Sequence, residues 1–383
     1  MTSMGVPRAL TIAGSDNGGG AGIQADIKTF QELDVYGMTA ITAIAVENTL
    51  GVYGVYPLPP EAAAEQIEAV GSDIGVDALK TGMLFSADII CAVVEQISKF
   101  GWTNVVVDPV MIAKGGGELL RTEAVEALKE KLLPLALIVT PNIPEAEVLS
   151  GISIRSMCDR REAARRIRAL GPKIVVIKGG HDTGEDRQIV WSRETYGKSE
   201  EYDNRRGRTN DDHKDCGYSG ESSEDFAGHK TTENAQNNGY IGGNGNGNDS
   251  YSIESMIGGH RSVGNYRVEG IISGHRSGGS ECDFSRNGDY HQGSEQVVDL
   301  IYDGEVFTEL TGKRVHTVNT HGTGCTFSAA ITAELAKGSL PLVAIANARA
   351  FIQAAIEDGL YLGGGNGPTN HWAYRRRRQE VLR

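Results

Sequence analysis

The sequence predicts an α/β protein with one mostly parallel sheet covered by helices on both faces. The first observation is a repeated order, in which a short apolar strand ends in a polar side chain and a helical segment follows. The second is that these strands are apolar throughout, as in NVVVDP at residues 104–109, which is typical of strands buried on both faces. The third is that this order is interrupted once, by a long segment of different composition.

The expected elements of the first half follow in order. A strand at 8–13 ends in the glycine-rich loop 14–22, and a helix follows at 23–33. Pro59 and Pro60 suit the first turn of a helix that runs to about Val70. Further strands are expected at 38–47, 51–56, 77–82, 104–109, 136–140 and 173–178, and further helices at 87–100, 122–132, 145–149 and 159–170.

The segment 187–296 is dominated by Gly, Asn, Ser, Asp and Glu, with sparse aliphatic residues that show no period. Such a composition buries too little apolar surface to offset the entropy of ordering, so a disordered insertion is expected. The expected organisation is a single domain made of residues 1–186 and 297–383, interrupted by that insertion.

Regular structure is expected again from Val297. Strands at 297–302 and 305–310 flank Asp303-Gly304, which is a hairpin signal. Helices are expected at 327–336 and 342–357, with a closing loop at 363–371. The four arginines at 375–378 are expected to form a solvated tail.

Composition excludes several classes of protein. The formal net charge of −13 argues against binding nucleic acid through a basic surface. No apolar run is long enough to cross a membrane, and the N-terminus lacks a signal-peptide pattern. The five cysteines are scattered and have no CxxC spacing, which favours a reducing cytoplasm over a zinc site or a disulfide framework.

One glycine-rich turn, NTHGTGCTFSAA at residues 319–330, predicts an anion site. Glycines alternate with small polar residues and a helical segment follows, so free backbone N–H groups converge at the positive end of a helix dipole. Cys325 stands where the first helical turn begins, a position that is expected to lower the pKa of a thiol. Taken alone, an ordinary loop-to-helix turn explains the stretch about as well.

Polar side chains at the strand ends predict a ligand-binding rim, because ligands of such sheets bind beyond the carboxyl ends of the strands. The loop 14–22 matches neither GxGxxG in register nor a P-loop, which favours close backbone approach to a small ligand, with Asp16 and Asp26 as polar handles. Asp16 also suits a turn or cap. The rim residues are Asp16, Glu47, Asp108, Asn142, Glu145 and Lys178.

Six elements in this order resemble the hydroxymethylpyrimidine kinase / phosphomethylpyrimidine kinase family of thiamine biosynthesis. They are LTIAGSDNGGGAGIQADIKTF, TGML, VVVDPVMIAKGG, TPNIPEAE, KGGH and NTHGTGCTFSAAITAELAKG, and the ending GPTNHWAYR agrees. The resemblance covers residues 8–186 and 297 to about 375. It implies a three-layer αβα ribokinase-like fold and transfer of the ATP γ-phosphate to a pyrimidine hydroxymethyl group, with a second phosphorylation to the diphosphate.

The resemblance also implies roles for particular residues. A pyrimidine pocket would be lined by Gly14, Asp26, Glu47, Met83 and Val110, and Thr140 and Lys178 would lie near the nucleotide. Mg²⁺ would be held directly or through water by Asp108, Asn142 and Glu145. An anion hole would be formed by Gly322, Thr323 and Gly324, with Cys325 beside the attacking hydroxyl as a general base.

One departure leaves alternatives open. The family usually has glutamine where this chain has Glu47, and an ionised glutamate only accepts hydrogen bonds from an aminopyrimidine edge. A pyridoxine/pyridoxal kinase of the same fold is therefore the second interpretation, and an inactive scaffold that uses the insertion as an interaction arm is the third. The expected partners are the pyrimidine and ATP, and a homodimer stays open.

Overall fold

The computed structural model of the chain describes residues 5–111, 122–180, 272–274 and 295–381. Within these ranges the strands form one sheet in the order β3-β2-β1-β4-β5-β6-β7-β9-β10-β8. The strands are β1 (Arg8–Asp16), β2 (Tyr36–Asn48), β3 (Gly51–Pro57), β4 (Ala78–Thr81), β5 (Val105–Val107), β6 (Ile138–Val139), β7 (Ile174–Ile177), β8 (Ile272–Gly274), β9 (Gln296–Tyr302) and β10 (Phe307–Lys313).

The centre of the sheet is parallel and its edges are antiparallel. Neighbouring strands from β2 through β1, β4, β5 and β6 to β7 pair in parallel. On one side β3 turns back on β2, and on the other side β9, β10 and β8 continue the sheet with antiparallel pairs. The predicted hairpin at Asp303-Gly304 joins β9 and β10. The α/β class and the mostly parallel sheet are therefore confirmed.

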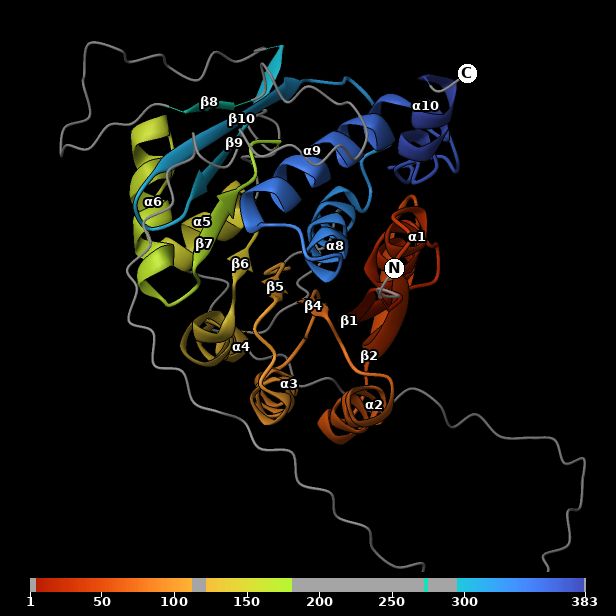
Figure 1. The fold of residues 1–383 in the computed structure, drawn as a ribbon, viewed down its shortest axis with the longest axis vertical. Helices are drawn as coiled ribbons and strands as arrows, with labels where there is room; N and C mark the ends of the chain where they lie inside the picture. Colours follow the sequence, from red (N-terminus) through yellow and green to blue (C-terminus); the bar gives the residue numbers. More distant parts are fainter. Residues whose placement is uncertain (1–4, 112–121, 181–271, 275–294, 382–383) are drawn as a thin grey trace, which may run out of the picture. The chain divides into compact units, whose positions relative to one another are not determined.

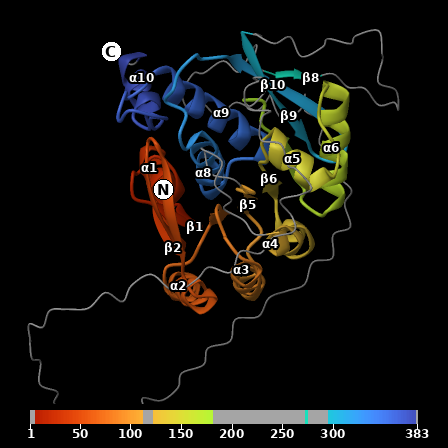
Figure 2. The same cartoon turned by 180° about the vertical axis from the view of Figure 1, so that it is seen from behind.

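Helices cover both faces of the sheet, which gives three layers (Figures 1 and 2). They are α1 (Gly22–Glu32), α2 (Pro60–Asp73), α3 (Ala87–Phe100), α4 (Thr122–Ala127), α5 (Ile143–Ser150), α6 (Met157–Ala169), α8 (Thr323–Ala336), α9 (Pro341–Glu357) and α10 (Ala373–Val381). Two separate apolar clusters hold the layers together. One cluster packs α2 to α6 on the sheet and the other packs α1, α8 and α9 on the opposite face.

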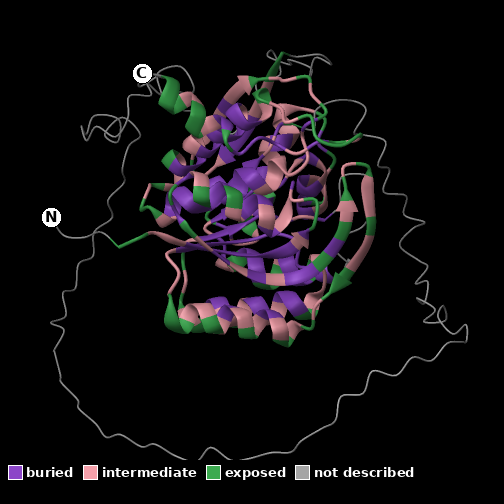
Figure 3. Cartoon of the chain, turned by 90° about the vertical axis from the view of Figure 1, so that its right-hand side faces the viewer, coloured by how far each residue is buried: buried purple, intermediate pink, exposed green. Residues whose placement is uncertain are grey.

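Strand β5 shows how one strand serves both clusters. Val105 and Val107 belong to the cluster under α3, and Val106 between them belongs to the cluster under α8. Side chains alternate across a strand, so an unbroken apolar run is required wherever both faces are covered. Figure 3 shows the result, with buried strands in the middle and helices that are exposed only on their outer sides.

Two helices differ from the sequence-based expectation. Helix α8 begins at Thr323 rather than Phe327, because Gly322 takes the left-handed conformation (φ 77°) and forms the N-cap. The expected solvated tail is helix α10. Its arginines are anchored, since Arg375 lies 3.0 Å from Asp34 and Arg377 lies 2.6 Å from Glu357.

The helix expected at 122–132 is also irregular. After α4 the chain forms a π-helical turn at Leu128–Leu132 and a 3₁₀ turn at Leu133–Leu135. Pro134 lies inside this last turn, where its missing N–H prevents the α-helix from continuing. The shift brings the chain directly into β6.

Strand β8 lies inside the range predicted as an insertion, and it pairs with Thr308–Leu310 of β10. Apart from β8, Glu295 and Gln296, residues 187–296 lie outside the described residues. The expected domain boundaries thus stay a prediction. In the part of the chain that the structure describes, no helix combines the length and the hydropathy needed to cross a bilayer.

Candidate active site

The glycine turn before α8 packs tightly on the loop after β1. A Cβ atom at Gly322 would lie 1.8 Å from the Gly20 carbonyl oxygen, so only glycine fits there. Nε2 of His321 donates a hydrogen bond of 3.0 Å to the carboxylate oxygen Oδ2 of Asp16. The predicted anion-hole residues Gly322, Thr323 and Gly324 therefore form the N-cap and the first turn of α8, where backbone N–H groups lack helical partners.

A cation lies beside this first turn. Nζ of Lys178, which follows β7, would be 3.2 Å from a Cβ atom at Gly324. The same Nζ lies 2.8 Å from Oδ1 of Asp108, which follows β5, and Thr140 donates to that oxygen at 3.1 Å. Asp108 is buried, and burial alone would raise its pKa, but the charges of Lys178 and Lys80 outweigh burial and lower it. Lys178 and Asp108, two residues of the predicted rim, are thus brought together at the helix terminus, and Thr140, which the resemblance placed near the nucleotide, lies beside them.

Asn142 and Glu145 form a capping box at the start of α5. Oδ1 of Asn142 accepts from the Glu145 N–H at 2.9 Å, and Oε2 of Glu145 accepts from the Asn142 N–H at 2.8 Å. Burial, with a smaller contribution from the Asp108 charge, raises the pKa of Glu145 to about 7 against the opposing charge of Lys178. These two side chains therefore cap helix α5, and this structural role explains part of the motif that suggested metal ligands.

The donor set still fits Mg²⁺. Asp108 and Glu145 are two buried carboxylates beside the ammonium of Lys178. The charge of Lys80, which also acts on Asp108, is already paired with Asp26. Hard oxygen ligands and a shortage of positive charge are the conditions that favour Mg²⁺, which usually keeps several waters. A bound cation would lower the pKa of Glu145, which burial and the Asp108 charge now raise.

The loop after β1 is organised by Asp16. Its Oδ1 accepts from the N–H groups of Gly18 and Gly19, and its Oδ2 accepts from those of Gly20 and Ala21. Burial would raise the pKa of Asp16, but the hydrogen bonds from His321 and from the backbone lower it to about 2. Asp16 thus holds the turn, as in the second of the two roles that the sequence suggested, and His321 is a further hydrogen-bond partner.

Glu47 lies beside this loop at the end of β2. Its Oε2 is 3.8 Å from Nε2 of His321, and its N–H donates to Oδ1 of Asn17 at 2.8 Å. Burial, reinforced by the Asp16 charge, raises the pKa of Glu47 to about 7. Asp16, Glu47 and His321 are the group of potential metal ligands that comes together among the described residues. Since the oxygens of Asp16 already accept four backbone N–H groups, they have little capacity left to bind an ion.

Of the other predicted pocket residues, Gly14 and Met83 lie in contact and Val110 is half-buried, whereas Asp26 is fully buried. A Cβ atom at Gly14 would lie 2.2 Å from Cε of Met83, so these two residues are in contact. Val110 is half-buried next to Asp108 and donates its N–H to the Asp108 carbonyl at 2.9 Å. Asp26, in contrast, is fully buried, and its two carboxylate oxygens accept from Thr11 (2.6 Å) and Lys80 (2.8 Å).

The expectation of an acidic thiol at Cys325 is wrong for this structure. The side chain is half-buried at the start of α8. Burial raises its pKa to about 12, and the carboxylates of Asp26 and Asp108 add to this, while Lys80 and a hydrogen bond from the Gly22 N–H oppose it. The loss of hydration exceeds the effect of the helix terminus, so Cys325 is a neutral thiol at pH 7.

Three polar residues of the site were not assigned a role from the sequence. Ser328 on α8 donates to Oδ2 of Asp108 at 3.3 Å, His321 bridges the two glycine loops, and Lys80 is buried beside Asp26. A lysine inside the short strand DALKTG was the one available signal, because a charged residue in a central strand requires a buried partner.

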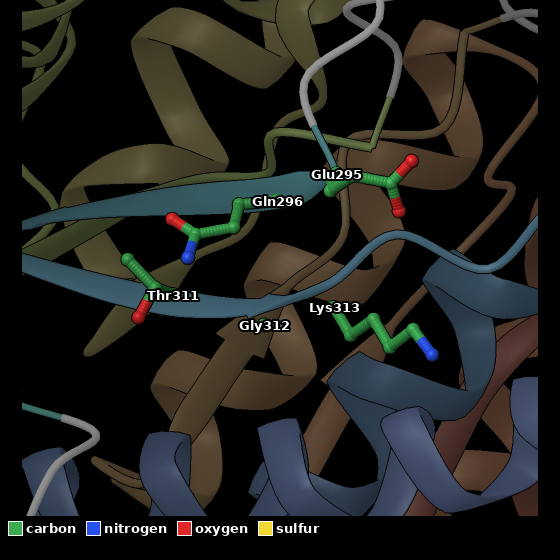
Figure 4. A pocket seen from close by; sticks show the side chains of 5 residues that line it. All are labelled: Glu295, Gln296, Thr311, Gly312 and Lys313. Atoms are coloured by element: carbon green, nitrogen blue, oxygen red, sulfur yellow. The ribbon is translucent and has the colours of Figure 1, made fainter.

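A separate hollow of about 340 Å³ lies where β9 begins and β10 ends (Figure 4). It is lined by Glu295, Gln296, Thr311, Gly312 and Lys313. None of the predicted site residues lines it, and it belongs to the antiparallel edge of the sheet rather than to the rim.

Comparisons with known proteins agree with this geometry. The family model described as phosphomethylpyrimidine kinase matches residues 16–234 and 284–370. A hydroxymethylpyrimidine/phosphomethylpyrimidine kinase of Bacillus subtilis is 39% identical over 97% of this chain and 97% of its own length. A pyridoxine kinase of the same organism is 35% identical over 98% of this chain and 100% of its own length.

Solved structures show the same fold. An ADP complex of Bacillus subtilis pyridoxal kinase matches with a TM-score of 0.63 and 33% identity, covering 97% of this chain and 100% of that one. A phosphomethylpyrimidine kinase from Clostridium difficile matches with a TM-score of 0.56 and 31% identity, covering 91% of this chain and 99% of that one. The fold is therefore ribokinase-like, and the chain belongs to the phosphomethylpyrimidine kinase family, whose members are phosphotransferases.

Proposed function

We propose that this chain phosphorylates 4-amino-5-hydroxymethyl-2-methylpyrimidine and its monophosphate with ATP, in thiamine biosynthesis. The observation that carries the proposal is the contact of Lys178 with the first turn of α8, where Gly324 and Cys325 lie. A helix N-terminus and a lysine together stabilise the charge that develops on a transferred phosphoryl group. The hydroxymethyl acceptor would lie between this turn and the wall formed by Gly14 and Met83.

In this proposal each group has a defined task. The N–H groups at 322–325 and Lys178 bind the γ-phosphate, and Asp108, Asn142 and Glu145 hold Mg²⁺ directly or through water. The ion supplies charge to the phosphates when it is bound. Gly14, Met83 and Val110 form the apolar part of the pyrimidine pocket, and Glu47 faces the ring edge.

The second candidate is a pyridoxine/pyridoxal kinase, favoured by the 35% identical pyridoxine kinase relative. A side-by-side assay with the hydroxymethylpyrimidine and with pyridoxal, each at saturating MgATP, separates the two. We expect kcat/KM to be higher for the pyrimidine. A higher value for pyridoxal would reverse the assignment, and absence of ATP consumption with either would revive the scaffold interpretation.

A homodimer and a cytoplasmic location complete the proposal. Alternate residues of β2 and their neighbours on the edge strand β3 are apolar and exposed, namely Ile44, Val46, Tyr53 and Tyr56. A second copy of the chain would cover this face. Light scattering after size exclusion should give a dimer mass for the parent and a monomer mass for Tyr53→Asp/Tyr56→Asp. The thiols of Cys91 and Cys325, which form no disulfide within the described residues, suit a reducing compartment.

A further inference from the structure

A buried ion pair joins helix α9 to strand β9. Nε of Arg349 in α9 lies 3.0 Å from Oδ2 of Asp299 in β9, and the two side chains are 8% and 9% exposed. The contact is electrostatic rather than an aligned hydrogen bond, because this Nε–H finds no acceptor of suitable geometry in the described part of the chain. Strand β10 makes room for the guanidinium at Gly312, where a Cβ atom would lie 2.0 Å from a terminal nitrogen of Arg349.

Stability alone is a weak reason for this pair. Aspartate is depleted in strands, and the attraction within a buried ion pair commonly returns no more than the loss of hydration costs. Ile345 and Ile352, which are neighbours of Arg349 on the same face of α9, belong to the apolar cluster on this side of the sheet. An apolar residue would therefore suit the position of Arg349, and the other contacts of Asp299 offer a better explanation.

The second carboxylate oxygen of Asp299 holds the chain just after β7. The ladder between β7 and β9 ends at Ile177 and Leu300. Beyond this end, the Gly179 N–H donates to Oδ1 of Asp299 at 2.8 Å. The approach requires glycine, since a Cβ atom at Gly179 would lie 2.0 Å from the Val298 carbonyl oxygen. The Asp299 side chain thus extends the connection between the two strands past the end of their ladder.

Lys178 lies between two backbone anchors. Its own N–H donates to the Pro141 carbonyl at 2.9 Å, and the next N–H along the chain is the one that Asp299 binds. Its Nζ pairs with Asp108 and would lie 3.2 Å from a Cβ atom at Gly324, in the first turn of α8. A lysine stem is flexible, so the place that its ammonium reaches depends on where the backbone is held.

We propose that Asp299 is a positioning residue for Lys178, and that Arg349 keeps the Asp299 carboxylate turned toward Gly179. The hydrogen bond to the Gly179 N–H fixes the backbone at the end of β7, and this places the lysine ammonium against the first turn of α8. Asp299 and Arg349 act through the backbone rather than on the nucleotide. The inference rests on the proposed function for the contact of Lys178 with the γ-phosphate, and it is independent of which acceptor is phosphorylated.

Nucleotide binding without an acceptor tests the placement of Lys178. MgADP and the β,γ-methylene analogue of MgATP differ by the γ-phosphate group. The ratio of their dissociation constants, measured by calorimetry on the full chain, therefore reports contacts to that group. Lys178→Met should weaken the analogue relative to ADP about 10-fold or more, the typical contribution of a charged hydrogen bond. An unchanged ratio in this variant would overturn the proposed contact of Lys178 and, with it, the role of Asp299.

Two double variants separate the hydrogen bond from the ion pair. Asp299→Asn/Arg349→Met removes both charges but keeps an oxygen that can accept from the Gly179 N–H, and Asp299→Leu/Arg349→Met lacks that oxygen. Apolar residues of similar volume often replace a buried ion pair without loss of stability, so the leucine form is expected to fold. It should shift the nucleotide ratio at least ~5-fold toward the value of Lys178→Met, and the asparagine form should stay near the parent.

Equal ratios in the two double variants would refute the positioning role while Lys178→Met still shows its own effect. If the leucine form does not fold, Arg349→Met alone should shift the ratio in the same direction, and an unchanged ratio refutes the role of the pair. Glu309→Ala is the matched control, because it breaks the Arg161–Glu309 pair on the neighbouring strand β10. An equal shift in this control would show general loosening and would also overturn the proposal.

The route through Lys178 is tested by combining the changes. If Asp299 acts through Lys178, the leucine form should change the nucleotide ratio in the parent background and add nothing in the Lys178→Met background. Such non-additivity is what a double-mutant cycle measures. A purely structural pair would change the ratio by the same factor in both backgrounds, and that result would overturn the proposal.

Discussion

Lys178 and Asp108 form an ion pair, with 2.8 Å between Nζ and Oδ1, and the lysine side chain of this pair is 14% exposed while the aspartate is 1% exposed. The pair therefore has a solvent side and a buried side. The exposed side of the pair faces the first turn of α8. Lys178 can therefore contact an anionic ligand there while it stays paired with Asp108. Asp108 gains a low pKa from this arrangement, which keeps it ionised and available to a metal ion.

Lys178→Met should reduce activity strongly. The variant removes a charge-assisted donor from the developing phosphoryl charge, an effect typically on the order of 100- to 1,000-fold in kcat. It also leaves the Asp108 carboxylate with less compensation, so the KM for MgATP should rise. Lys173→Met is the matched control, since Lys173 is exposed just before the other end of β7. If steady-state kinetics showed equal losses of kcat in both variants, Lys178 would have no specific role in the site.

Cys325→Ala should lower turnover far more than it weakens ATP binding. A group that transfers a proton typically contributes about 100- to 10,000-fold. Because burial raises the pKa of Cys325 to about 12, kcat of the parent should still rise with pH up to about pH 9. The alanine variant should lose this slope, whereas Cys158→Ala should keep it. An alanine variant with most of the parent turnover would leave Cys325 as a spacer in the anion hole.

Glu47→Gln should be tolerated and should flatten the pH dependence of pyrimidine affinity. The pKa of Glu47 is raised to about 7, so below pH 7 the protonated carboxyl can donate and accept as glutamine does. If the pyrimidine ring carries the proton instead, it pairs with the carboxylate of Glu47, and this pairing is likewise lost as the ring deprotonates at higher pH. The parent KM should thus rise above pH 7, and the variant KM should not. Identical profiles would show that Glu47 does not face the ring.

The raised pKa of Glu47 should also make the stability of the fold depend on pH, in a direction that can be predicted. An acid whose folded pKa is raised binds more protons in the folded state, so stability falls as pH rises from about 4.5 to about 7. Glu47→Gln removes this cost, and the Tm difference between variant and parent should therefore be larger at pH 8 than at pH 5. The reverse order would contradict the raised pKa.

The rim could be predicted because it depends on a local rule. Parallel strands end at one edge, so Asp108 and Lys178, which each follow an apolar run, had to lie close together. The turn before α8 was visible for the same reason, since glycines at fixed positions permit close approach. The resemblance to the kinase family then assigned roles that strand ends alone do not give.

The parts that could not be predicted depend on distant contacts or on burial. Lys80 and Asp26 are 54 residues apart, and neither local pattern indicates the other. The thiol of Cys325 was expected to be acidic because a helix terminus is visible in sequence, whereas the desolvation that outweighs it appears only after packing. Asn142 and Glu145 matched a family motif, but their mutual capping required the geometry of α5.

His371 should make the fold sensitive to mild acid. It is buried, its Nε2 lies 3.0 Å from Oγ1 of Thr326 in α8, and burial lowers its pKa from 6.5 to about 4. A base with a lowered folded pKa binds more protons when unfolded, so stability falls as pH drops from about 6.5 to about 4, by up to ~3 kcal/mol. In urea titrations, His371→Gln should reduce this loss of unfolding free energy at low pH. His316→Gln, which changes an exposed histidine, should not.

The predicted insertion can be tested by two deletions of different length. Joining Asp186 to Val297 removes all of 187–296, and we expect a folded kinase with activity within several-fold of the parent, because loop-closure entropy changes by only about 0.6 kcal/mol per doubling of length. This variant also removes β8 and its pairing with β10. Deleting only residues 191–266 keeps β8 and is the matched comparison.

The two deletions distinguish an inert insertion from a structural one. If both variants keep the parent Tm and activity, the edge strand β8 contributes little and the domain is complete without residues 187–296. A lower Tm in the longer deletion alone assigns stability to the β8–β10 pairing. Limited proteolysis of the parent should cut first between Arg187 and Gln296, since a segment poor in aliphatic residues offers little buried backbone to protect it. Failure of both deletions to fold, or resistance of this segment to protease, would show that it is a structured part of the kinase.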